Sequence, residues 1–406
     1  MPGPLSGIRI LEWAIWHAGP GANYMLGDLG ADVIKIEQPE VGDPERGYTR
    51  LEGSHIMDPD RPTGILFHIT NRNKKSVTID LTKEEGQQIL YRLVEKCDVF
   101  LQNFRPGVAA RLGVDYETLK KFNPKLIYVN VSGYGPKGPE SGLRGQDYIG
   151  LARSGFLSAM HSGDDELPHV TGAIADHMTC TTAAYGILAA LVARERMGVG
   201  QEIHTSLFGS MLGLQSVRIG QTLMMGREPA PRRRREMLNP IYNHYRCADD
   251  KWLALAVLAT ERVWPDVCKA LSMEELEKDP RFDSTEHRAE NCRELIDLLD
   301  HTFAGKPRDE WLKLLRQHRR IICSPILDPM DLLDDPQTME NDYIVEVEDQ
   351  ELGRIKQVGC PVTFTETPAK VQGPSPMFGQ HTEDVLLEVG GYTWDDISRF
   401  REGGVI

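Results

Sequence analysis

The sequence is 406 residues long, which is enough for two or three domains and a large hydrophobic core. Its formal net charge of −14 at pH 7 argues against nucleic acid as a partner, because phosphate binding requires a basic surface. No apolar run reaches the roughly 18 residues of a transmembrane helix and the N-terminus lacks a signal-peptide pattern, so we expect no membrane partner and a cytoplasmic protein.

The seven cysteines support a reducing, cytoplasmic compartment. They are Cys97, Cys180, Cys247, Cys268, Cys292, Cys323 and Cys360. No two are close in sequence, and no Cys/His group has the spacing of a metal site. We therefore predict no metal.

Strand and helix patterns alternate through the first third of the chain. Strands are predicted at 7–13, 32–37, 75–81, 98–104 and 126–131, and helices at 19–29, 82–96 and 116–122. This alternation predicts an α/β fold with a doubly wound, Rossmann-like parallel sheet. Ligands of such sheets bind at the carboxyl ends of the strands, which here lead into loops 14–21, 38–48, 103–107 and 132–147.

The first β-α-β unit invites a dinucleotide-binding interpretation, which its residues do not support. The phosphate fingerprint requires three glycines, but Tyr24 stands at the third place and Pro20 lies between Gly19 and Gly21. We do not predict a nicotinamide site.

The stretch 170–207 combines a glycine turn, the carboxylate of Asp176, a helix rich in small residues and a strand. Asp176 comes just before the predicted first turn, so capping is its simplest interpretation. The helix N-terminus would also help to keep this carboxylate ionised. Asp176 and Asp147 are the main candidates for chemistry, since the chain has no GxSxG, Walker or HExxH motif and a carboxylate can attack an activated acyl group.

The pattern changes after 207, which predicts a second domain. We expect a large domain from residues 1–225, completed by 326–406, and a small α/β domain at 226–325. The small domain would hold a strand at 252–257 and helices at 260–271, 286–303 and 307–317, followed by strand-like residues 345–362 and helices at 382–389 and 392–405. The run Arg232–Arg235 is either a solvated loop or a clamp for phosphate or carboxylate.

A series of motifs in fixed order makes the chain resemble the class III coenzyme A transferases, the formyl-CoA transferase-like family that includes carnitine, bile-acid and arylsuccinate CoA-transferases. The series is LSGIRILEWAIWHAGPGANYMLGDLGADVIKIEQP, NRNKKSVTIDL, DVFLQNFRPGVAARLGVDYETLKKFNPKLIYVNVSGYGPKGP, RGQDYIGLARSG, TGAIADHMTCTTAAYGILAAL, RMGVGQEIHTSL, DEWLKLL and FGQHTEDVL. It covers nearly the whole chain.

The resemblance implies that Asp176, at the end of the segment Gly172–Asp176, is the catalytic nucleophile. It would form an acyl-aspartyl anhydride and then an aspartyl-CoA thioester, moving CoA from an acyl-CoA donor, succinyl-CoA for example, to an organic acid. Acyl-CoA would be a substrate, with no tightly bound cofactor. The family also forms an interlocked homodimer.

The resemblance further implies a set of residues that contact CoA. They are His17, Ala18, Gln38, Asn103, Phe104, Arg105, Arg111, Arg144 and Gln146. Glutamine is frequent in the family where His17 stands, and formyl-CoA transferases carry arginine in place of Gln38. The glycine run of the formyl-CoA transferases is replaced by Asn239–Tyr245, which with Trp16 suggests an acid larger than oxalate.

Two alternatives remain open. A 2-methylacyl-CoA racemase shares the fold and the aspartate, but its histidine falls in a GHD segment where this chain has Gln146. An inactive partner subunit of a CoA-transferase is the second alternative.

Overall fold

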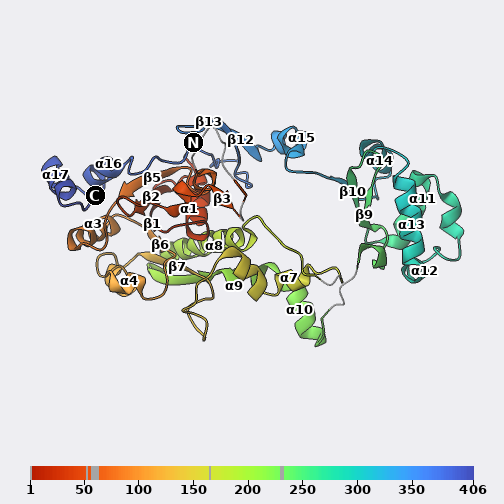
Figure 1. The fold of residues 1–406 in the computed structure, drawn as a ribbon, viewed down its shortest axis with the longest axis horizontal. Helices are drawn as coiled ribbons and strands as arrows, with labels where there is room; N and C mark the ends of the chain where they lie inside the picture. Colours follow the sequence, from red (N-terminus) through yellow and green to blue (C-terminus); the bar gives the residue numbers. More distant parts are fainter. Residues whose placement is uncertain (1, 52–53, 56–63, 164–165, 229–232) are drawn as a thin grey trace. The chain divides into compact units, whose positions relative to one another are not determined.

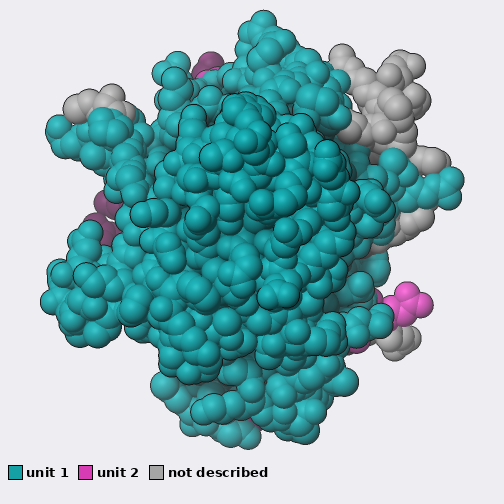
Figure 2. Space-filling model, turned by 90° about the vertical axis from the view of Figure 1, so that its left-hand side faces the viewer, with its two compact units in different colours: residues 1–157, 169–226, 339–406 teal, residues 158–168, 227–338 magenta. Residues whose placement is uncertain are grey.

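The structure is a computed structural model that describes residues 2–51, 54–55, 64–163, 166–228 and 233–406. The chain divides into two compact units, which are coloured separately in Figure 2. The first contains Met1–Leu157, His169–Gly226 and Met339–Ile406, and the second Ser158–Pro168 and Arg227–Thr338. The chain returns to the first unit at Met339, whereas the sequence predicts this return near residue 326. Among the described helices, none combines the length and apolarity needed to cross a bilayer.

A six-stranded parallel sheet forms the centre of the first unit (Figure 1). Its strands are β1 (Arg9–Trp13), β2 (Asp32–Glu37), β5 (Lys74–Thr78), β6 (Val99–Gln102), β7 (Ile127–Ser132) and β8 (Gln201–Ser206). Their order is β5-β2-β1-β6-β7-β8, and each neighbouring pair is parallel. The predicted parallel α/β sheet is confirmed. The order reverses between β1 and β6, which defines the switch point of the sheet.

Successive residues of β1 point to opposite faces of the sheet and enter different cores. Ile10 packs with α1 (Ala18–Asp28) and α8 (Ile174–Met197), while Leu11 packs with α3 (Glu84–Val94), α16 (Thr382–Glu388) and α17 (Trp394–Glu402). Both faces of the sheet are therefore covered by helices, as in a doubly wound fold. The last two helices also bring the C-terminal segment beside β5 (Figure 1).

Shorter elements complete this part of the chain, and two of them, at 156–159 and 336–340, extend across the boundaries between the units in the sequence. They are η1 (Pro44–Gly47), β3 (Arg50–Leu51), β4 (Ser54–His55), α2 (Ile65–Thr70), α4 (Val108–Arg111), α5 (Tyr116–Leu119), α6 (Asp147–Arg153), α7 (Phe156–Ala159), α9 (Leu207–Leu214), α10 (Ser216–Met225), α15 (Pro336–Glu340), β12 (Ile344–Asp349) and β13 (Gly353–Val358). The predicted strand-like run 345–362 is mainly the antiparallel hairpin β12-β13, turned by the residues between Asp349 and Gly353.

The second unit is built on a three-stranded antiparallel sheet with its own core. Its elements are η2 (Arg234–Glu236), β9 (Tyr242–Arg246), β10 (Trp252–Ala256), α11 (Thr260–Leu271), η3 (Glu274–Lys278), α12 (Thr285–Glu290), α13 (Cys292–Phe303), α14 (Arg308–Leu315), β11 (Cys323–Ile326) and η4 (Asp331–Leu333). The helix predicted at 286–303 is two helices, since Asn291 leaves the helical conformation.

The arginine run has carboxylate partners within the second unit. Arg234 pairs with Asp300 at 2.5 Å and Arg235 with Asp297 at 2.6 Å, both on α13. Arg232 lies outside the described residues. These two arginines therefore fasten the linker to α13, which leaves less of their charge for a phosphate.

Two helical glycines differ in how much room they have for a methyl group. A Cβ on Gly86 would lie 2.0 Å from the Asp80 carbonyl oxygen, whereas a Cβ on Gly213 would meet nothing within 4 Å. We expect Gly86→Ala to lower the free energy of unfolding by about 1–3 kcal/mol through overpacking. Gly213→Ala, the matched control, should leave it unchanged or raise it by up to about 1 kcal/mol. Urea unfolding followed by circular dichroism measures both, and equal effects would contradict the close contact.

Candidate functional site

The loop after β1 is fixed at the switch point of the sheet by Asn103, which follows β6. The Asn103 side-chain oxygen accepts a hydrogen bond from the Ile15 N–H at 3.0 Å, and its Nδ2 donates to the Ile15 carbonyl at 2.6 Å. Phe104 stacks on Trp13 with ring centroids 4.0 Å apart. The end of β6 thus holds the loop that carries His17 and Ala18.

Two non-glycine residues adopt left-handed backbone conformations beside the candidate residues. Trp16 has φ 60° immediately before His17, and Ala173 has φ 54° at the start of α8. Such conformations cost of order 1–3 kcal/mol and tend to persist at functional sites. The Trp16 N–H donates to Asp43 Oδ1 at 3.1 Å, which helps to hold the loop in this form.

A buried charge network lies beneath this loop. Glu12 is fully buried and contacts Lys35 at 2.9 Å and Lys74 at 2.8 Å. Burial alone would raise the pKa of Glu12, but the two ammonium groups outweigh it and lower that pKa. Lys35 also donates to the Ala14 carbonyl and Lys74 to the Pro20 carbonyl, each at 2.8 Å. The network therefore fixes the backbone on both sides of His17.

The loop after β2 joins the same network through two carboxylates. Asp43 lies 2.8 Å from Lys35, and its Oδ1 accepts the Glu45 N–H at 3.0 Å. Burial, followed by the nearby Asp43 charge, raises the pKa of Glu45 to about 7. The Thr70 hydroxyl donates to Glu45 at 2.8 Å. Sequence reasoning missed Glu45, because nothing local marks an acidic residue that becomes buried by a distant helix.

Asp176 is the third residue of α8, so it lies within the first turn of the helix rather than before it. The N-cap position is Ala173, so the interpretation of Asp176 as an N-cap is wrong. The Asp176 N–H, one of the unpaired donors of the first turn, is instead accepted by Asp147 Oδ1 at 3.0 Å. Asp147 begins α6, and the two helices approach closely: a Cβ on Gly150 would lie 2.9 Å from that of Ala175.

Electrostatics leave Asp176 poised between its two protonation states near neutral pH. Burial raises its pKa to about 7, and the charges of Asp147 and Glu45 add to that rise. From the sequence we expect the helix N-terminus to keep this carboxylate ionised. Desolvation and two like charges outweigh the helix dipole here, because the dipole amounts to only about half a charge.

The imidazole of His17 lies against the same part of α8. Cys180 Sγ donates to the His17 and Ala18 carbonyls at 3.5 and 3.4 Å, and the ring centroids of His17 and His177 are 6.0 Å apart. Burial, followed by His177 and Lys74, lowers the pKa of His17 to about 4, so the ring is neutral at pH 7. Sequence reasoning missed His177 and Cys180, although both lie within the quoted helix motif.

The remaining predicted contact residues lie on the surface near strand or helix ends. Gln38 follows β2, Arg105 follows β6, Arg111 ends α4, and Arg144 and Gln146 precede α6; all five are exposed. The loops that carry Gln38, Arg105, Arg144 and Gln146 leave the same edge of the parallel sheet as those of His17, Ala18, Asn103 and Phe104. No distance among the described residues joins them into one pocket, so their contact with a ligand stays a prediction.

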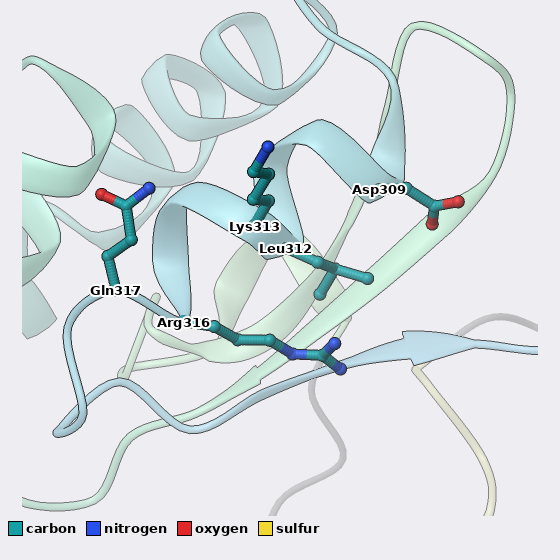
Figure 3. Close-up of a pocket in the computed structure, with 5 residues that line it drawn as sticks. All are labelled: Asp309, Leu312, Lys313, Arg316 and Gln317. Carbon is teal, nitrogen blue, oxygen red and sulfur yellow. The ribbon is translucent and has the colours of Figure 1, made fainter. Parts of the chain in front are cut away.

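A cavity of about 430 Å³ lies elsewhere, on α14 in the second unit (Figure 3). It is lined by Asp309, Leu312, Lys313, Arg316 and Gln317. None of these is a predicted site residue, and we assign it no role in the chemistry.

The chain is similar to known proteins over nearly its whole length. The sequence profile of CoA-transferase family III matches residues 5–382. A succinyl-CoA–D-citramalate CoA-transferase of Chloroflexus aurantiacus is 32% identical over 410 residues, covering 100% of this chain and 98% of that protein. A succinate–glutarate CoA-transferase of Agrobacterium fabrum is 33% identical over 391 residues, covering 95% and 96%. The crystal structure of a CAIB/BAIF family protein from Brucella suis has a TM-score of 0.82 and 30% identity, covering 96% and 100%.

The raised pKa of Asp176 predicts how stability depends on pH. A carboxyl whose folded-state pKa exceeds its unfolded value stabilises the fold below the unfolded pKa, and that contribution is lost as pH rises from about 4 to about 7. Asp176→Asn removes this loss. We therefore expect the difference in unfolding free energy, Asp176→Asn minus wild type, to increase by on the order of 2 kcal/mol between about pH 5 and pH 8.

Urea unfolding at both pH values measures this rise. Asp115→Asn is the control, since Asp115 is a helix cap that accepts the Thr118 N–H at 3.1 Å. A rise of the same size in both variants, or none in Asp176→Asn, would contradict the electrostatic description.

Proposed function

The chain belongs to CoA-transferase family III, and from that premise we propose that it moves CoA between carboxylic acids through a covalent intermediate on Asp176. The observation that carries this proposal is the setting of Asp176. Its carboxylate lies in the first turn of α8, one turn before Cys180, which contacts the loop held at the switch point, and its pKa is near 7. Such a group is ionised in a large fraction of molecules at neutral pH yet poorly solvated, which suits a nucleophile.

The proposed reaction proceeds through four acyl exchanges. The Asp176 carboxylate attacks the thioester carbonyl of the donor, giving an acyl-aspartyl anhydride and CoA thiolate. The thiolate attacks the aspartyl carbonyl, forming an aspartyl-CoA thioester and releasing the donor acid. The acceptor carboxylate then attacks this thioester, and the released thiolate finally attacks the acceptor carbonyl. Asp176 is regenerated as a carboxylate, and the free energy of the thioester is retained without ATP.

We assign the CoA contacts to the residues at the carboxyl edge of the sheet. The loop of His17 and Ala18 and the end of β6 at Asn103 form the base of this site, because hydrogen bonds join them. The exposed guanidinium groups of Arg105 and Arg111 follow β6 and suit the phosphates of CoA. Gln38, Phe104, Arg144 and Gln146 complete the proposed set.

For the substrates, we propose succinyl-CoA as donor and an acid larger than oxalate as acceptor. Of the two relatives described above, one is named for succinyl-CoA and D-citramalate and the other for succinate and glutarate. Trp16 is 42% exposed and packs edge-on against Tyr48 at 5.3 Å between ring centroids. This aromatic pair beside His17 provides an apolar surface for a carbon chain that oxalate lacks.

The racemase alternative has less support from the described residues. It requires a second group that exchanges protons opposite Asp176, and the side-chain amide of Gln146 does not titrate. An inactive partner subunit is disfavoured because the proposed nucleophile is present.

We also propose that the chain forms an interlocked homodimer, as its family does. The division of the first unit into three chain segments, with the second unit inserted, supports this. Light scattering of the intact protein tests it, and a monomeric mass in the active protein would contradict it. The cytoplasmic location stays a prediction.

Replacement of Asp176 tests the mechanism. With succinyl-CoA and a panel of acceptor acids, we expect Asp176→Ala to lose at least about 10³-fold in kcat/KM, because the covalent route is removed. Hydroxylamine added to wild type with donor should leave a hydroxamate on Asp176, which peptide mass spectrometry detects.

Asp115→Asn, the cap variant on α5, serves as a control that should retain activity and the adduct. An Asp176→Ala variant with full transferase activity would rule out the mechanism. Exchange of the α-hydrogen of a 2-methylacyl-CoA, without CoA transfer, would instead indicate the racemase.

A further inference from the structure

Three potential metal ligands converge where the loop after β1 meets α8. His17 comes from the loop, and His177 and Cys180 come from the first two turns of the helix. One ligand atom from each of the three lies within 4.8 Å of the others. Within the described parts of the chain, no other group of three such residues meets this distance. From the sequence we predict no metal, because no Cys/His group has the spacing of a metal site.

The geometry is close to that of a zinc site. Zn–N distances of about 2.0–2.1 Å and Zn–S distances of about 2.3 Å place tetrahedral ligand atoms roughly 3.3–3.6 Å apart. A pair of ligand atoms at the full 4.8 Å would need to close by about 1.2–1.5 Å, which side-chain rotations supply. With Zn–N distances of about 2.0–2.1 Å, two tetrahedral imidazoles would have centroids about 5.2 Å apart. Those of His17 and His177 are 6.0 Å apart, so the rings need to approach each other by somewhat less than 1 Å.

An unpaired nitrogen supplies a second, independent observation. His17 Nε2 is buried and makes no hydrogen bond, although buried polar atoms nearly always have a partner. Gly21 creates the space beside it: a Cβ there would lie 2.3 Å from Cys180 Sγ and 3.8 Å from the His17 ring. Without a side chain at Gly21, sulfur and imidazole can share one small volume.

The surrounding charges favour a cation. Asp176 directly precedes His177, and Asp147 and Glu45 are near enough to raise the pKa of Asp176. Lys74 opposes them, since its charge acts on both His17 and Cys180. The neutral His17 ring offers a lone pair at pH 7, whereas burial raises the pKa of the Cys180 thiol. The thiol proton must therefore leave as the sulfur–metal bond forms.

We propose that His17, His177 and Cys180 form a three-ligand site for a thiophilic divalent cation of the zinc class. A fourth position remains for water. Binding replaces the weak Sγ–H contacts to the His17 and Ala18 carbonyls by a thiolate–metal bond and releases one proton. The cation enters from the side of His177, which is the exposed ligand of the three.

Cobalt(II) is the probe of choice for the intact protein, because a thiolate ligand gives it a charge-transfer band. We expect one cobalt per chain with this band, and zinc should displace it. Cys180→Ala should abolish the band, and His177→Ala should weaken the affinity at least about tenfold by removing a ligand. Cys360→Ala is the matched control, since Cys360 is a partly exposed thiol that contacts the Val362 carbonyl.

Two results would overturn the site. One is an absent thiolate band at saturating cobalt, and the other is a band that survives in Cys180→Ala but disappears in Cys360→Ala. If Cys180→Ala fails to fold, His177→Ala decides the question, because His177 is exposed on the helix surface. Unchanged cobalt affinity in that variant would then overturn the proposal.

An ion at this position would hinder the adjacent nucleophile, a consequence that rests on the proposed function. Enzyme loaded with zinc and then desalted should lose transferase activity and regain it with a chelator. In His177→Ala, the ratio of the activity without zinc to the activity of the zinc-loaded protein should be smaller than in wild type. Cobalt binding without any transferase activity would leave the site standing and reject the function. Transferase activity without cobalt binding would support the function and reject the metal site.

Discussion

The organisation of the site depends on two buried lysines that share one carboxylate. Lys35 lies on β2 and Lys74 on β5, and both ammonium groups contact the carboxylate of Glu12 on β1. Removing one partner would leave a buried charge uncompensated, which is far more costly than losing a surface ion pair. Both ammonium groups also donate to backbone carbonyls on either side of His17. The charge network therefore specifies the path of a loop as well as stabilising the sheet.

Close packing of small residues brings the two halves of the site together. Gly21 on α1 touches Cys180 on α8, and Gly150 on α6 touches Ala175. Larger side chains at either glycine would push α8 away from the loop or from Asp147. The left-handed residues Trp16 and Ala173 occur where these tightly packed segments begin, so the surrounding packing holds them in a strained conformation.

The same packing sets the electrostatics of Asp176. A helix N-terminus favours an ionised carboxylate, but closing α6 and the loop of Glu45 around it removes water and adds two like charges. The result is a carboxylate that exchanges its proton near neutral pH instead of one that is permanently charged. The neutral His17 beside it arises from the same desolvation.

The sequence by itself determined the α/β class, the parallel sheet and the family. Alternating strands and helices and a long series of ordered motifs are local or cumulative signals that need no coordinates. The motif series also identified Asp176 as the residue to test. Its predicted position as an N-cap was wrong, because helix ends depend on one or two residues of turn geometry that pattern alone does not resolve.

Only the tertiary structure decided which side chains share the neighbourhood of Asp176. Glu45, His17 and Asp147 come from three loops that the sequence already predicts at one edge of the sheet, but the sequence does not indicate which of their side chains approach α8. Burial and charge–charge interactions depend on distances in space, so pKa shifts and convergent ligands appear only once the chain is folded. The break of the helix at Asn291 was likewise visible only in the folded chain, since no glycine or proline marks it in the sequence.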